Sequence, residues 1–145
     1  KFCLTIQIYK AMEKYLYFCK GGSGDKLFNA AHDVAVYPVS SFRGFTNQTT
    51  TQTHLGMLFA PIEGQIDNAD VSDVVTLTIT SDKHKEVIEA ILAAIDAPKV
   101  AGTGKSMIVI ADLMLQDFLP VGPDSSGNAV AISDMSITVQ VGAAS

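Results

Sequence analysis

The side chains that could do chemistry are scattered along this chain of 145 residues. His32, His54 and His84 lie far apart, and none has the close His or Cys neighbour that a zinc site uses. The sequence also lacks the G-x-S-x-G elbow of a serine hydrolase. We therefore expect no metal site, no cofactor and no catalytic residue, and we expect that the protein is not an enzyme.

Four carboxylates are the remaining candidates for a site. Asp67, Asp70 and Asp73 are close enough in sequence to hold calcium, but the glycine and the final glutamate of an EF-hand loop are missing. We expect them in a solvated acidic loop. Asp112 follows an apolar run and could be a catalytic carboxylate at a strand end. No base or nucleophile can be named beside it, so we expect a turn residue.

One short segment, Gly102–Ser106, has the glycine, lysine and serine that end a phosphate-binding P-loop. The first glycine of that motif should stand at position 99, which is Lys99. A P-loop also follows a strand and opens a helix, whose N-terminus binds the phosphate. Here the expected order is helix, then strand, so we predict a plain turn that binds no nucleotide.

The centre of the chain predicts a strand, an amphipathic helix and a second strand. Val74–Thr80 is rich in β-branched residues, and Met107–Ala111 is a continuous apolar run typical of a buried strand. Between them we predict a helix from about Asp82 to Ile95, with Ser81 or Asp82 as its N-cap and Pro98 beyond its end. His84 should lie at the edge of the apolar face. The side chains expected to be buried on that face are Val87, Ile88, Ile91, Leu92 and Ile95.

Shorter patterns surround this unit. Ser40–Phe45 indicates a turn anchored by two aromatic residues, and Asn47–Thr53 is either a loop tip or an exposed edge strand. The interval 116–128 is expected to be a long surface loop. Further strands are expected at Tyr15–Cys19, at Val34–Tyr37 with Pro38 ending it or marking a sheet edge, at His54–Phe59, and at Ala129–Val141 as one bulged strand or two short ones.

Helical crossovers are missing between most of these strands, which favours antiparallel pairing. The expected fold is α+β, a mostly antiparallel sheet of six to seven strands with one amphipathic helix. A β-sandwich with the helix at its side is the close alternative. At this length we expect one domain over residues 1–145.

Composition narrows the function classes. Charged residues make up only 17% of the chain, against about 25% in an average domain. Such an uncharged surface suits a protein that packs against copies of itself or a partner. The net charge of -5 argues against nucleic-acid binding, and no apolar run is long enough to span a membrane. Cys3 and Cys19 could pair with each other, although buried thiols are favoured.

The first residues alternate at strand period from Phe2 to Tyr9, and the chain starts at Lys1. Either residues 1–11 are an extension ahead of Met12, or the chain was cut from a longer precursor. An added strand of this kind pairs readily with a neighbouring chain, and so does the expected strand Ser136–Val141. We predict that at least one of them makes contacts between subunits.

The strand–helix run Val74–Ile95, followed by Ile108–Asp112, resembles small uncharacterised proteins of marine bacteriophages, notably phages of cyanobacteria. The segments Lys14–Cys19 and Tyr37–Ser41 add to this resemblance, which covers residues 12–112. It implies a phage-encoded protein of the virion, and it assigns no catalytic residue.

Together these observations favour a structural virion component, a capsid decoration or a capsid- or tail-associated protein. It would assemble with itself and with other virion proteins, without catalysis. The alternative is a small-molecule-binding or regulatory protein.

Overall fold

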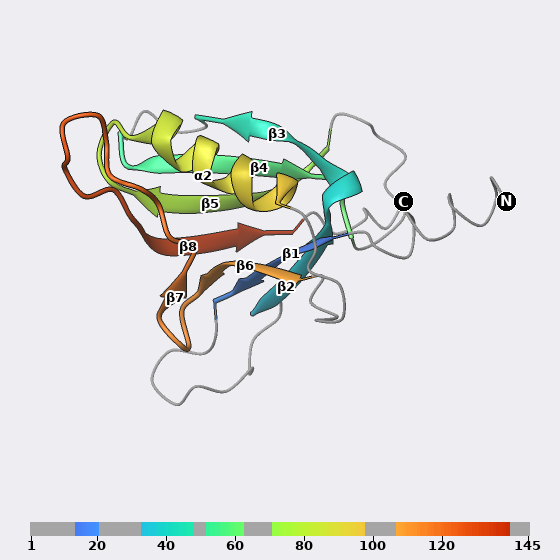
Figure 1. Cartoon of the computed structure of the whole chain (residues 1–145). Helices are drawn as coiled ribbons and strands as arrows, with labels where there is room; N and C mark the ends of the chain where they lie inside the picture. Colours follow the sequence, from blue (N-terminus) through green and yellow to red (C-terminus); the bar gives the residue numbers. More distant parts are fainter. Residues whose placement is uncertain (1–13, 21–32, 48–51, 63–70, 98–106, 140–145) are drawn as a thin grey trace, which may run out of the picture.

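The structure is a computed structural model that describes residues 14–20, 33–47, 52–62, 71–97 and 107–139. Within these ranges eight strands form two four-stranded sheets, and one α-helix packs beside them (Figure 1). Most strand pairs are antiparallel. The expected α+β fold, mostly antiparallel sheet with one helix, is confirmed.

The first sheet has the strand order β3-β4-β5-β8 and is antiparallel throughout. In its central strands every second side chain is buried in the core; β5 alternates strictly, and in β4 the intervening Gly56 is buried as well. The last strand carries the bulge that its sequence pattern suggested: Thr78 lies opposite Asp134, whereas Ile79 lies opposite Ile132. One continuous strand therefore absorbs the change of phase. The strands are β3 (Phe42–Thr46), β4 (His54–Phe59), β5 (Asp73–Ile79) and β8 (Ile132–Thr138).

The second sheet has the order β2-β1-β6-β7. Its central strand β1 pairs antiparallel with β2 and parallel with β6, which places Tyr15 opposite both Pro38 and Met107. Pro38 ends an edge strand, as expected. The interval 116–128 is mostly loop, except for the short strand β7. The strands are β1 (Tyr15–Cys19), β2 (Val34–Pro38), β6 (Met107–Asp112) and β7 (Asp117–Phe118).

An aromatic cluster joins the two sheets. The rings of Tyr37 on β2 and Phe59 on β4 are stacked with their centres 4.2 Å apart, and Phe18 on β1 meets both of them edge-on. Phe42 and Phe45 on β3 extend the cluster from its side. Aromatic pairs at such distances stabilise a core beyond the burial of their area. This cluster therefore fixes how the two sheets face each other.

The turn expected at Ser40–Phe45 is wrong in form. A short 3-10 helix, η1 (Val39–Ser41), leads directly into β3. The glycine at position 44 made this stretch resemble a turn, but it sits at a register shift of the β3–β4 ladder, with a φ of 141°. The two phenylalanines do anchor the segment, because both pack against the core.

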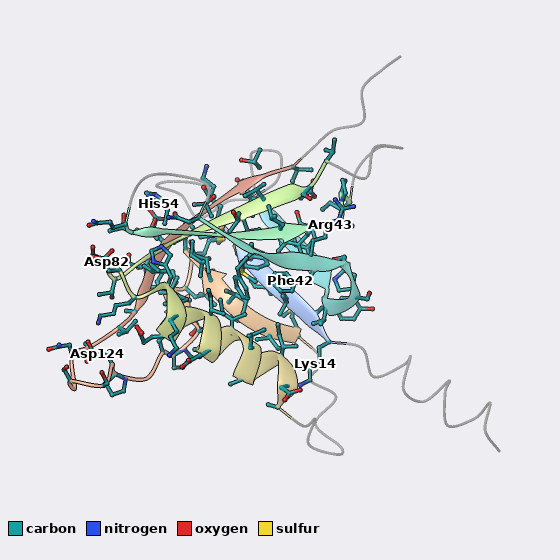
Figure 2. The ribbon with its side chains drawn as sticks, turned by 90° about the horizontal axis from the view of Figure 1, so that it is seen from above. Lys14, Phe42, Arg43, His54, Asp82 and Asp124 are labelled. Atoms are coloured by element: carbon teal, nitrogen blue, oxygen red, sulfur yellow. The ribbon has the colours of Figure 1, made fainter. Side chains whose placement is uncertain are left out.

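The helix α2 (His84–Asp96) buries Val87 and Ile91 completely, and Ile88 and Ile95 pack partly against the core. Leu92 was expected to be buried but is 46% exposed. The buried stripe is thus narrower than the apolar stripe of the sequence. The helix runs beside the sheets (Figure 2), and Leu92 lies on the part of its surface that they leave uncovered.

The predicted N-cap of this helix is also wrong. Lys83 occupies that position without a side-chain cap. Asp82 instead lies in a left-handed turn with a φ of 62°, and its backbone N–H donates to the carbonyl oxygen of Gln52. At the other end the Lys14 ammonium donates to the carbonyls of Ile95 and Ala97 (Figure 2). A cation is favourable there, since the last carbonyls of a helix lack partners.

The strand β6 is buried only in its second half, since Met107 at its start is 50% exposed.

Several expected segments are not covered by the structure. Phe2–Tyr9, Gly102–Ser106 and residues 63–70 lie outside the described ranges, as do most of Asn47–Thr53 and the end of Ser136–Val141. Within the ranges described, no helix has the length and apolar character to cross a membrane.

Candidate functional site

Asp73 is the most deeply buried carboxyl group among the described residues, at 0% exposure. It is the first residue of β5, and its side chain lies on the side of the strand that faces the core. The expected solvated loop is therefore wrong at this position. The Tyr37 hydroxyl donates to its Oδ2 over 2.8 Å, and the backbone N–H of Ile62 approaches the same atom at 3.3 Å. Asp67 and Asp70 lie outside the described residues.

This arrangement gives Asp73 a structural role. A buried polar group costs free energy unless it is hydrogen-bonded, and here the donor comes from the opposite sheet. The contact therefore links β2 to β5 through the core. Since the carboxyl group is fully enclosed, a substrate does not reach it in this conformation.

The described histidines are used locally. His84, the first residue of α2 at the edge of its apolar face, places Nε2 2.8 Å from the carbonyl oxygen of His54. Because a carbonyl accepts, the imidazole N–H donates and holds the helix start against β4. The expected position of His84 is confirmed. His32 is outside the described ranges, within which no three metal-ligating side chains cluster.

Asp112 ends β6 and accepts the backbone N–H groups of Met114 and Leu115 at 3.0 and 3.1 Å. It is therefore a turn residue, as predicted. Nearby, burial raises the pKa of Tyr17 to about 12, with further contributions from a hydrogen bond to Cys19 and from the charge of Asp112. Cys19 itself is buried, and its pairing with Cys3 falls outside the described residues.

Sequence reasoning missed Asp124. Its carboxylate lies 2.9 Å from the Lys83 ammonium, and it accepts the backbone N–H groups of Ser126 and Asn128. The hydrogen bond from Lys83 and those from the loop hold the pKa of Asp124 well below its usual range. An Asp-Ser-Ser-Gly-Asn run is a turn signal that predicts part of this. The result is a loop fixed to the start of α2, on the same side as Asp82 (Figure 2).

The outer side of β2, β1 and β6 exposes apolar side chains, and we call this surface the apolar face. Register places Tyr17 between Val36 and Val109, and Tyr15 beside Met107. Its exposed members are Tyr15 at 39%, Val34 and Val36 at 38% each, and Met107 at 50%, with Tyr17 and Val109 half-buried.

The exposed outward positions of these three strands carry no charged side chain. A sheet face that meets water normally alternates with polar residues. In the other sheet β8 follows that rule, because its outward positions are Ser133, Asp134, Ser136 and Thr138. The signal was present in the sequence, since Val-Ala-Val-Tyr lacks a polar alternate, but which side faced outward needed the fold.

Comparisons with models of protein families, with curated proteins and with solved structures give no match to this chain.

Proposed function

We propose that this protein is a structural component of a virion, a capsid decoration or a capsid- or tail-associated protein, that assembles with copies of itself and performs no catalysis. The apolar face is the observation that carries the self-assembly part. The virion part draws on the resemblance of residues 12–112 to marine phage proteins. Other virion proteins are the further partners.

The free energy of hydration favours covering the apolar face. Each Å² of apolar surface that leaves water contributes roughly 25 cal/mol, so an uncharged sheet face gains by being covered. A stable pairwise interface buries about 800 Å² on each partner. Four partly exposed side chains supply only part of that area. Each contact through this face is therefore weak alone, and repeated contacts in an assembly make it effective.

Electrostatics favours the same kind of partner. The chain carries a net charge of -5, which repels nucleic acid. On the apolar face itself no exposed charge has to be desolvated when another apolar surface covers it. An uncharged protein surface fits these conditions.

A small-molecule site needs several polar groups that converge on a concave surface. In the described part of the chain, Tyr37 bonds Asp73 inside the fold, and the buried polar side-chain atom left without a hydrogen bond is Oε2 of Glu86 on α2. One such atom is not a convergent set. This alternative therefore has less support than self-assembly.

Sedimentation velocity of the purified chain over a concentration series tests the proposal. We expect the wild type to form oligomers and Met107→Glu, on the apolar face, to weaken them. Leu92→Glu is the matched control, because Leu92 is similarly exposed but lies on α2. A wild-type monomer at every concentration, or equal loss in both variants, would contradict the proposal.

A further inference from the structure

The strand β2 forms one edge of its sheet (Figure 1). The ends of its ladder with β1 show which backbone groups pair inward. The N–H of Lys20 donates to the carbonyl of Asp33 over 2.7 Å, and the N–H of Val39 donates to that of Lys14 over 3.0 Å. Residues 33 and 39 therefore direct their backbone groups toward β1.

In an antiparallel ladder this direction alternates along the strand. Ala35 and Tyr37 consequently bond β1, whereas Val34 and Val36 turn both N–H and C=O toward the other side of β2, where none of the described strands pairs with it. At the far end Pro38 has no N–H, and its carbonyl accepts the Ser41 hydroxyl at 2.8 Å. The edge thus presents two complete donor–acceptor sets, one on each valine.

The other sheet edges carry features that block pairing. On β3 the ladder shifts register at the charged Arg43, and on β8 it shifts beside Asp134. Bulges and charges of this kind keep edge strands apart. The fourth edge, β7, has only two residues. By contrast β2 runs through five register pairs without a shift and has no charged side chain.

The two sets on β2 are self-complementary. In an antiparallel arrangement with a second copy, Val34 faces the copy's Val36, and Val36 faces the copy's Val34. Each of these two pairs exchanges two hydrogen bonds, and Ala35 meets the copy's Ala35 on the two-fold axis. That central pair is the close kind, with Cα atoms about 4.5 Å apart, and it suits two methyl groups.

We propose that copies of this chain meet edge to edge through β2 in this register, so that two β2-β1-β6-β7 sheets become one continuous sheet. The inference rests on the proposed function and names the surface through which self-assembly begins. A second copy fits the charge pattern, because two chains of net charge -5 meet here without bringing a charged side chain of either β2 into contact. The pairing also merges the two apolar faces into one larger surface.

The exchange of single backbone amides tests this directly on the wild-type chain. Hydrogen exchange followed by NMR should show the N–H groups of Val34 and Val36 becoming slower as concentration rises, together with the oligomer seen by sedimentation. The N–H groups of Ala35 and Tyr37 serve as internal controls. They bond β1 within one chain, so their protection should not depend on concentration.

A charge at the edge provides the second arm. Val36→Lys, at a side chain that is 38% exposed, should abolish both the oligomer and the concentration-dependent protection. Ser136→Lys, at an exposed position of the edge strand β8, is the matched control and should change neither. Circular dichroism verifies that both variants are folded.

The outcomes separate the two proposals. A wild-type monomer at every concentration overturns the proposed function and this inference with it. A wild-type oligomer whose Val34 and Val36 amides exchange as fast as in the dilute chain overturns this inference alone. An oligomer that Val36→Lys leaves intact overturns this inference, and it also counts against assembly through the apolar face, to which Val36 belongs. The amide measurement needs no variant, so the inference remains testable even where Val36→Lys does not fold.

Discussion

Replacing Tyr37 with phenylalanine removes one oxygen atom from the middle of the fold. That oxygen donates to Asp73 over 2.8 Å, a normal length for an O–H···O hydrogen bond. Phenylalanine keeps the ring, so the stack on Phe59 and the edge contact with Phe18 remain. The substitution therefore tests the contact between the sheets without making a large cavity.

The expected cost follows from what Asp73 loses. Leaving a buried acceptor without its donor costs roughly 1–3 kcal/mol. Because Ile62 still donates to the same carboxyl oxygen, at 3.3 Å, we expect no more than this range. Tyr15→Phe is the matched control. Its hydroxyl belongs to a side chain that is 39% exposed, so its effect should stay within about 0.5 kcal/mol.

Urea unfolding followed by circular dichroism measures both variants, at a protein concentration low enough to keep the chain monomeric. An unchanged slope with a lower midpoint for Tyr37→Phe identifies a loss of stability. Adding Asp73→Asn and the double variant closes a mutant cycle, which should give a coupling energy of about 0.5–3 kcal/mol. If Tyr37→Phe loses no more stability than Tyr15→Phe, the contact does not join the sheets energetically.

Ile91→Ala should cost roughly 2–5 kcal/mol in urea unfolding because it leaves a cavity beneath α2, whereas Leu92→Ala, at a side chain that is 46% exposed, should cost about 0.5 kcal/mol or less. Equal losses would place the wrong face of the helix inward. Tyr17, whose pKa is raised to about 12 from 10.0, adds stability that is complete below pH 10 and is lost as the pH rises toward 12. Urea midpoints should therefore fall more steeply over that interval in the wild type than in Tyr17→Phe, and parallel curves would exclude the effect. Deleting Lys1–Ala11 should weaken assembly, measured by light scattering, more than it lowers the melting temperature. If the shortened chain assembles as before, or fails to fold, the segment Phe2–Tyr9 is not an assembly arm.

Local patterns in the sequence predicted β1, β2, β4, β5, β6 and β8 because each of these strands has an apolar pattern of its own, whereas β3 was expected to be a turn and β7 part of a loop. The run from His54 to Phe59 places three large apolar side chains on one side, and that is enough to define β4. The bulge in β8 was visible in the same way, since Ile132 and Ile137 cannot share a face without an extra residue. These features need no knowledge of the partner strand.

Features that depend on distant partners were missed. Asp73 resembles a loop carboxylate until Tyr37 is known to lie opposite it, and nothing near Asp73 in the sequence indicates that. Leu92 belongs to the apolar stripe of the helix, but how much of a stripe becomes covered is decided by the sheets beside it. The apolar face was missed for a similar reason: three separate strands have to be neighbours before their valines and tyrosines form one surface.

The parallel pair of β1 and β6 has a consequence for how the chain is made. The ribosome delivers β1 and β2 early, and they are able to pair at once. The other side of β1 stays open until Met107–Asp112 has emerged, because its partner is encoded there. Pairings between residues so far apart in sequence form slowly. During synthesis each nascent chain therefore has an unpaired edge of β1. Closely spaced chains on one messenger RNA are then able to exchange their β6 strands before folding is complete.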